Sequence, residues 1–234
     1  MKYKRVLLKL SGESLMGEER HGISPAQLEV YAGEIQKVVA KQVQVAVVLG
    51  GGNIYRGMQG VEKGFDRVQG DYMGMLATII NSMALQGTLD AMGVKSILLS
   101  GIAIHPLTQL MNKRTALKYI EENYVVIIAG GTGNPYFTTD SAAALRASEI
   151  EADVLLKGTR VDGIYSADPE KDKNAVKYDQ ISYDEAYDKK LNVMDLTAFT
   201  LCKENSLPII VFDINTKGNI FKIVEGEKIG TIVS

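Results

Sequence analysis

Three apolar, strand-like runs, each leading into a glycine-containing segment, constrain the fold of this chain most. The runs lie at 6–10, 45–49 and 125–129 and lead into Ser11–Ser14, Gly50–Asn53 and Gly130–Pro135. Ligands of open parallel sheets bind just beyond the carboxyl ends of the strands. Glycine there lets backbone N–H groups approach an anion such as phosphate. The sequence therefore predicts a site for one large, highly anionic ligand or for two of them.

Strand-like and helix-like segments alternate along almost the whole chain. A capping box with proline at the first helical position, at 24–27, begins the first helical pattern. Further strands are expected at 43–49, 96–99, 124–129, 153–157, 208–213 and 229–233, and helices at 71–92, 112–123, 141–150, 183–190, 195–206 and 218–224. Residues 158–182 are polar and predict a loop with a hairpin. This pattern predicts a three-layer α/β/α sandwich with a mainly parallel sheet, built as one domain of two lobes, about 1–150 and 151–234.

Composition excludes several classes of protein. The net charge is −2 and 46% of residues are hydrophobic, so a strongly basic nucleic-acid-binding face is not expected. The single cysteine, Cys202, excludes an intrachain disulfide and is expected to be a small core residue. The sequence has neither a signal-peptide pattern nor an apolar run that could span a membrane. We therefore expect a cytoplasmic protein without membrane or nucleic-acid partners.

The first two glycine segments carry candidate cations for phosphate. Lys9 stands at the end of an otherwise apolar strand, where a buried lysine without an anionic partner would be costly. It could stabilise a phosphoryl group in transfer, although a solvated surface lysine is the alternative. Arg56 follows Gly50–Asn53 within reach and could grip phosphate oxygens. The glycines alone could equally form a plain tight turn.

The third segment is the richest, because it supplies hydroxyls, amides and two aromatic rings before a helix start. Thr138 and Thr139 precede the helix expected near Asp140, and a helix N-terminus favours an anion. Asp140 could orient a lysine or a metal, or it could simply be the N-cap of that helix. Asp71 has the same two interpretations, because it could bind sugar hydroxyls or cap the long helix.

The polar segment after residue 157 offers a second candidate ligand region. Tyr165 could stack on a base, with Thr159 and Asp168 providing polar contacts, or residues 162–169 could form only a hairpin. The chain has neither a G-x-x-x-x-G-K-[ST] P-loop nor protein-kinase motifs. His21 and His105, its only histidines, form no metal-ligand or triad pattern. Phosphate transfer by this chain would therefore need another architecture.

Together these motifs resemble the bacterial uridylate kinases of the amino acid kinase superfamily, which transfer phosphate from ATP to UMP. The resemblance rests on KLSGE at 9–13, GGGNIYRG at 50–57, GDYMGMLAT at 70–78, GGTGNPYFTTDSAAALRA at 130–147 and VDGIYSADP at 161–169. It covers essentially the whole chain. It implies the amino acid kinase fold, an acceptor-binding N-terminal lobe and an ATP-binding C-terminal lobe.

The resemblance also implies a role for each matching position. Catalytic roles fall on Lys9, Arg56 and Asp140. ATP contacts fall on Lys9, Leu10, Ser11, Gly12, Gly52, Arg56, Thr159, Tyr165 and Asp168. UMP contacts fall on Gly51, Asp71, Thr132, Gly133, Asn134, Pro135, Tyr136, Phe137, Thr138 and Thr139. Mg²⁺ is expected with ATP, and its ligands in the protein stay unassigned.

The family is typically hexameric, activated by GTP and inhibited by UTP, and these are expectations here. The activation segment matches Gly17, Glu18, Glu19, Arg20, His21 and Gly22. Its Arg20-His21 departs from the Gly-Phe of some members, so GTP activation stays open. The Met73, Met75 and Met83 stretch is expected at a subunit interface. Two rivals stay open: a superfamily kinase for carbamate, an amino acid or another nucleotide, and a non-catalytic binder on the same fold.

Overall fold

The computed structural model describes residues 1–19, 21–55, 64, 66–169, 171–172, 174–191 and 193–234. Its main sheet is built around β1 (Arg5–Leu10), which pairs in parallel with β2 (Gln44–Leu49) and with β6 (Val154–Thr159). The full order is β4-β3-β5-β2-β1-β6-β10-β11-β9. The other strands of this sheet are β3 (Ser96–Ser100), β4 (Gln109–Leu110), β5 (Val125–Ala129), β9 (Gln180–Ile181), β10 (Ile209–Asp213) and β11 (Thr231–Val233).

The predicted parallel character is confirmed, with one exception at the carboxyl-terminal edge. The final strand, β11, runs antiparallel to β10 and parallel to β9. The expected hairpin is present as β7 (Ile164–Tyr165) paired with β8 (Lys177–Tyr178). The short strand β9 was not foreseen, because two residues are too few to show a periodic pattern.

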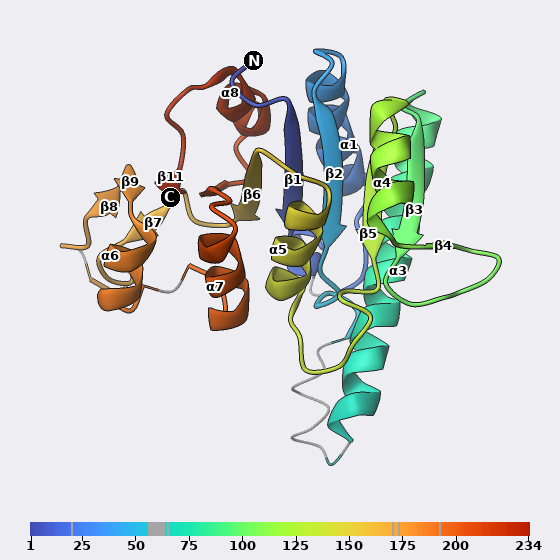
Figure 1. Cartoon of the computed structure of the whole chain (residues 1–234), viewed down its shortest axis with the longest axis horizontal. Coiled ribbons are helices and arrows are strands. Elements are labelled where there is room, and N and C mark those ends of the chain that lie inside the picture. The colour runs from blue at the N-terminus through green and yellow to red at the C-terminus, as the bar shows by residue number, and fades with distance from the viewer. Residues whose placement is uncertain (20, 56–63, 65, 170, 173, 192) are drawn as a thin grey trace.

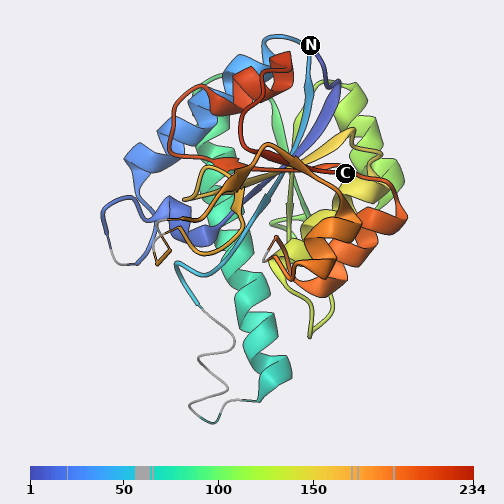
Figure 2. The same cartoon turned by 90° about the vertical axis from the view of Figure 1, so that its left-hand side faces the viewer.

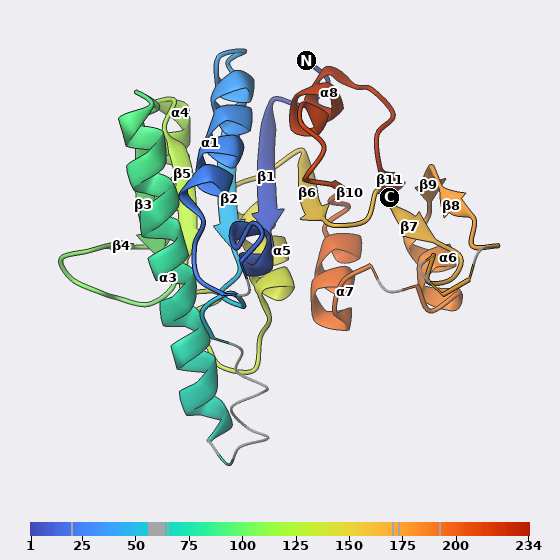
Figure 3. The same ribbon diagram turned by 180° about the vertical axis from the view of Figure 1, so that it is seen from behind.

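Helices cover both faces of the sheet, as Figure 2 shows from the side. The helices are η1 (Gly12–Leu15), α1 (Pro25–Val39), α3 (Arg67–Ala91), α4 (Lys113–Glu121), α5 (Thr139–Glu149), α6 (Tyr183–Asp188), α7 (Leu196–Glu204) and α8 (Asn219–Glu225). In Figure 1 α4, α5 and α7 lie in front of the sheet, whereas α1, α3 and α8 are in front in the reverse view of Figure 3. The three-layer α/β/α sandwich is therefore confirmed.

Alternate residues of each central strand face opposite cores. In β1, Leu8 and Leu10 pack with α1 and α3, whereas Leu7 packs with the small residues of α5 and α7. Strands buried on both faces need apolar residues at every position, which explains the unbroken apolar runs. Cys202 lies in the second core, as expected, and burial raises the pKa of its thiol to about 12.

The long helix begins earlier than its sequence pattern indicated. Asp66 is the N-cap of α3, and its side chain accepts a hydrogen bond from the Gln69 N–H at 3.0 Å. Asp71 therefore lies inside the helix, and its interpretation as a cap is wrong. The N-terminal half of α3 extends past the carboxyl ends of the strands (Figures 1 and 3). Among the described residues, none of the helices is long and apolar enough to cross a membrane.

Candidate functional site

The strand order brings the three glycine segments together at one edge of the sheet. They follow β1, β2 and β5, which are neighbours in the sheet and run in parallel. The first two segments touch: a Cβ added to Gly12 would lie 2.6 Å from Asn53 Oδ1 and 2.7 Å from the Gly50 oxygen. Only glycine fits at Gly12, because real Cβ atoms essentially never approach another heavy atom so closely.

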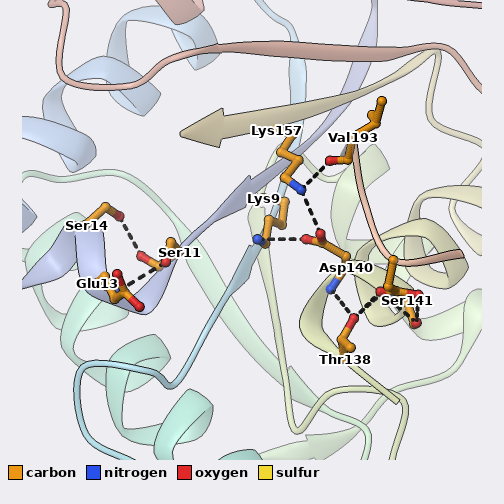
Figure 4. A network of polar contacts seen from close by, with 10 residues as sticks. Lys9, Ser11, Glu13, Ser14, Thr138, Asp140, Ser141, Lys157 and Val193 are labelled. Carbon is orange, nitrogen blue, oxygen red and sulfur yellow. Dashed lines mark hydrogen bonds and ion pairs between the residues drawn. The ribbon is translucent and has the colours of Figure 1, made fainter. Parts of the chain in front are cut away.

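Two lysines converge on one aspartate at this edge (Figure 4). Lys9 and Lys157 are register partners on β1 and β6, so their side chains leave the same face of the sheet. Lys9 Nζ lies 2.7 Å from Asp140 Oδ1, and Lys157 Nζ lies 2.7 Å from Oδ2. Lys157 also donates to the Val193 carbonyl at 2.6 Å. Asp140 therefore orients both lysines.

This cluster is buried and carries a positive charge. The exposed side-chain fractions of Lys9, Asp140 and Lys157 are 11%, 14% and 14%. Two cations against one carboxylate leave one positive charge that the trio itself does not balance. Since buried charges are costly unless paired, the arrangement is suited to an anion that brings further negative charge, such as a phosphate.

The electrostatics keep Asp140 ionised. Burial alone would raise the pKa of its carboxyl, but the charges of Lys9 and Lys157 outweigh burial and hold the pKa below its usual value. Burial lowers the pKa of Lys157, and Lys9 adds to this effect, whereas Asp140 opposes it. An ionised carboxylate bound by two ammonium groups is a poor general base, so its chemical role here is orientation.

Asp140 is positioned by the N-terminus of α5. Thr138 is the N-cap, and its hydroxyl accepts hydrogen bonds from the Asp140 and Ser141 N–H groups, both at 3.1 Å. The alternative that Asp140 caps this helix is therefore wrong. Its position in the first turn still places a carboxylate at the positive end of the helix dipole.

Asp195, which the sequence did not single out, ties this helix start to α7. Its carboxylate accepts hydrogen bonds from the hydroxyls of Thr138 and Ser141, the second at 3.0 Å. It also caps α7 by accepting from the Ala198 N–H at 3.0 Å. An N-cap aspartate can be recognised in a sequence, but its second contact is with a helix far away in the chain.

A cavity of about 240 Å³ lies between the second and third glycine segments. From the expected UMP contacts it gathers Gly51, Asp71, Thr132, Phe137, Thr138 and Thr139. Gly52, expected at ATP, lines this same cavity, as does Met75, which is buried inside the chain instead of exposed at an interface. The expected contacts Gly133, Asn134, Pro135 and Tyr136 do not line it.

Asp71 sits at the wall of this cavity with its carboxylate already engaged. Oδ2 accepts from Arg67 Nε at 2.9 Å and from the Tyr136 N–H at 2.8 Å. The Arg67 guanidinium lies 5.5 Å from the centre of the Tyr136 ring. Asp71 thus connects α3 to the third glycine segment at Tyr136.

A second cavity, of about 440 Å³, is bordered by one lysine of this cluster. Its lining includes Lys157 and the three residues expected at the ATP base and ribose, Thr159, Tyr165 and Asp168. Tyr165 donates to Asp162 Oδ1 at 2.6 Å. Lys189 and Lys190 also line this cavity, and the sequence motifs did not predict them there.

The remaining predicted residues fall into three groups. Leu10 is buried in the core and Ser11 caps η1, accepting from the Glu13 N–H at 3.3 Å. Gly17, Glu18, Glu19 and His21 are exposed. The Gly22 N–H donates to the Asn53 carbonyl at 3.0 Å, and the Gly22 carbonyl accepts from Asn53 Nδ2 at 2.8 Å. Arg20 and Arg56 lie outside the described residues.

The described residues do not fit a metal held by the protein alone. Both oxygens of Asp140 lie against lysines. Within the described ranges there is no group of three or more His, Cys, Asp or Glu side chains that could hold a metal ion. The Mg²⁺ expectation therefore concerns an ion that arrives with the nucleotide.

Comparison with known proteins agrees with this geometry. Residues 4–213 match the model of the amino acid kinase family. This chain therefore belongs to the amino acid kinase family. The uridylate kinases of Porphyromonas gingivalis and Parabacteroides distasonis are each 58% identical to it, over 99% of this chain and 97% and 98% of theirs.

Solved structures show the same relationship. The UMP kinase of Bacillus anthracis has a TM-score of 0.97 at 35% identity, covering 100% of this chain and 97% of the other. The UMP kinase of Ureaplasma parvum has a TM-score of 0.94 at 41% identity, with both chains covered completely. Within the family, the branch of this chain is thus the uridylate kinases, which are nucleoside monophosphate kinases. This family implies a divalent metal associated with ATP.

Proposed function

We propose that this protein transfers the γ-phosphoryl group of ATP to UMP, giving ADP and UDP for pyrimidine nucleotide biosynthesis. One observation carries the proposal: the Lys9–Asp140–Lys157 cluster adjoins two cavities. Lys157 lines the larger cavity, and Asp140 directly follows Thr138 and Thr139 of the smaller one. We assign the larger cavity to ATP and the smaller one to UMP. The names of the relatives support UMP as the acceptor.

The residues suggest a direct, in-line transfer. An oxygen of the UMP phosphate forms a bond to the γ-phosphorus while the bond from that phosphorus to the β,γ-bridging oxygen breaks, and ADP leaves. The attacking oxygen is already anionic at neutral pH, so a strong base is not needed. Repulsion between the two anions is the main barrier, and Lys9 and Lys157 lower it by facing the transferring group. Arg56 is proposed to add a further cation.

Magnesium enters this proposal as part of the ATP complex. Mg²⁺ bound together with ATP would neutralise negative charge that develops in the transfer. We place the reaction in the cytoplasm, as the resemblance to bacterial uridylate kinases implies.

The test is an ADP-release assay with ATP, Mg²⁺ and a panel of acceptors. We expect turnover with UMP, and slower turnover with CMP and AMP. Preference for an amino acid or carbamate would identify a different kinase of the superfamily. Failure to form ADP from ATP and UMP would instead indicate a binding protein on the same fold.

Self-assembly is a second part of the proposal, and α3 carries it. Leu76, Ile80 and Met83 recur at helical spacing and have exposed fractions of 46%, 50% and 41%. A contiguous apolar stripe on a long helix is typical of a protein–protein interface. We propose that it joins subunits of a homohexamer. Light scattering should show a hexamer for the native chain and smaller species for Ile80→Glu, whereas Val176→Glu, on the exposed hairpin, should stay hexameric.

We also propose control by GTP as activator and UTP as inhibitor. The supporting observation is that Gly22 is hydrogen-bonded to Asn53, so the 17–22 segment is directly connected to the second glycine segment. Initial rates at fixed ATP and UMP, with and without each nucleotide, test this. Rates that respond to neither nucleotide would contradict it.

A further inference from the structure

Arg146 is a buried cation that the proposed reaction does not use. It lies on α5 with an exposed fraction of 6%. Its Nη2 donates to the carbonyl oxygens of Gly131 and Thr132, both at 3.2 Å. Its Nη1 donates to Glu149 Oε2 at 2.7 Å. The guanidinium therefore joins the third glycine segment to the helix that carries Asp140.

The segment that Arg146 holds has an unusual backbone. Gly130, Gly131 and Gly133 have positive φ angles, and so does Tyr136, at 72°. A positive φ is costly for a residue with a side chain. Such a segment adopts one shape only if the surrounding structure imposes it. Arg146 contacts its centre, at two residues that line the smaller cavity.

The contact also sets the direction of one peptide group. The carbonyl of Gly131 points at Arg146. The C=O and N–H of a trans peptide point in opposite directions, so the Thr132 N–H is turned away from the guanidinium. Gly133 N–H is occupied by the Gly130 carbonyl at 3.0 Å. Arg146 thereby fixes the orientation of a backbone donor in the cavity wall.

Stability alone does not account for this residue. Its Nε is buried and finds no hydrogen-bond partner among the described residues. Burying a polar group without a partner costs free energy. Its Nη1 instead donates to Glu149 on the same helix, and its Nη2 donates to the carbonyl oxygens of Gly131 and Thr132 in the loop. Lysine, with a single ammonium group, cannot reproduce this planar geometry.

We propose that Arg146 is a positioning residue for the acceptor nucleotide, which acts through the backbone of Gly131 and Thr132. This inference rests on the proposed function. Because Arg146 and Asp140 share α5, one rigid helix holds both the acceptor loop and the carboxylate that orients the lysines. Arg146 is not among the residues that line the cavity proposed for ATP.

The test compares Arg146→Lys with the native protein in steady-state kinetics. We expect the KM for UMP to rise about 10-fold or more, because charge-assisted hydrogen bonds are lost, while the KM for ATP changes less than about twofold. Arg114→Lys, on an exposed arginine of α4, is the matched control. Glu149→Gln keeps the loop contacts and is expected to leave the KM for UMP unchanged.

Each outcome decides the question. An unchanged KM for UMP, or an equal rise for both substrates, would overturn the proposal. Arg146→Gln is the second variant if the lysine variant does not fold, and failure of both to fold would show a purely structural role. If the native protein itself forms no ADP from ATP and UMP, the proposed function is wrong. If only the effect of the Arg146 variants is absent, the proposed function stands and this inference is wrong.

Discussion

At the scale of single residues, Asp140 joins parts of the chain that are far apart. It forms ion pairs with Lys9 of β1 and Lys157 of β6, and its own position depends on Thr138, the N-cap of α5. Lys157 could have been found from the sequence by the argument used for Lys9, because it also ends an apolar strand. Lys157 was not predicted as a site residue, because phosphate contacts were sought only in and beside the three glycine segments. Only the sheet order shows that the two lysines are neighbours.

Replacement of Lys9 by alanine is expected to lower turnover by about 10²–10³-fold, because one stabiliser of the transferring phosphoryl group is lost. The fold should persist, since Asp140 keeps its pairing with Lys157. ADP release and thermal unfolding measure the two effects. Lys41→Ala, on an exposed lysine, should behave like the native protein. Near-normal turnover of the Lys9 variant would contradict its assignment.

The pH dependence of stability tests the Asp140 ion pairs. The pKa of Asp140 in the folded protein lies below its usual value of 3.8. Its ionised form therefore stabilises the fold above the unfolded-state pKa, and this contribution is lost as the pH falls through the lower folded-state pKa. The gap in unfolding free energy between native protein and Asp140→Asn should be constant above about pH 5 and narrow below about pH 4.

Urea unfolding at a series of pH values measures this gap. Glu151→Gln provides the control, because Glu151 pairs with Lys113 at the exposed surface, where ion pairs contribute little. A gap for Asp140→Asn that does not depend on pH would show that the two lysines do not stabilise the carboxylate.

At the scale of elements, the sequence predicted helices and strands well but their ends less well. Apolar periodicity identified α1 and α3, but α3 begins at Arg67 because Asp66 caps it. The short strands of the 158–182 segment were only partly foreseen. Periodicity needs several residues to be visible, whereas helix ends depend on a single cap.

Asp195 offers a test at this scale, because it holds the starts of α5 and α7 together. Asp195→Ala is expected to cost about 1–2 kcal/mol from the lost cap and to reduce turnover, since Thr138 and Ser141 lose their acceptor. Ser182→Ala removes the matched cap of α6, away from the cluster. It should lower stability and leave turnover unchanged. Equal turnover in both variants would show that Asp195 does not position Asp140.

At the scale of the whole molecule, the two predicted lobes share one core. The core between the sheet and α1 contains Leu8 and Leu28 from the first lobe, and Leu156 and Phe212 from the second. The β1–β6 pair continues the sheet across the boundary between them. We therefore expect one cooperative thermal transition for the two lobes together. Scanning calorimetry at fixed protein concentration tests this, and two separable transitions would contradict a single domain.

The amino-acid sequence alone was enough to predict that three glycine segments follow strands and that the fold is a mainly parallel sheet between helices. Local patterns suffice for this, because strand and helix periods are written in neighbouring residues. The three-dimensional packing was needed to show that β1 lies between β2 and β6, that Lys157 joins Lys9 at Asp140, and that Arg146 contacts the third glycine segment. These pairings depend on packing between distant segments, for which a single sequence carries no local signal. The glycine segments therefore remain a prediction of where anions bind, and the contacts around them are what the tertiary structure adds to that prediction.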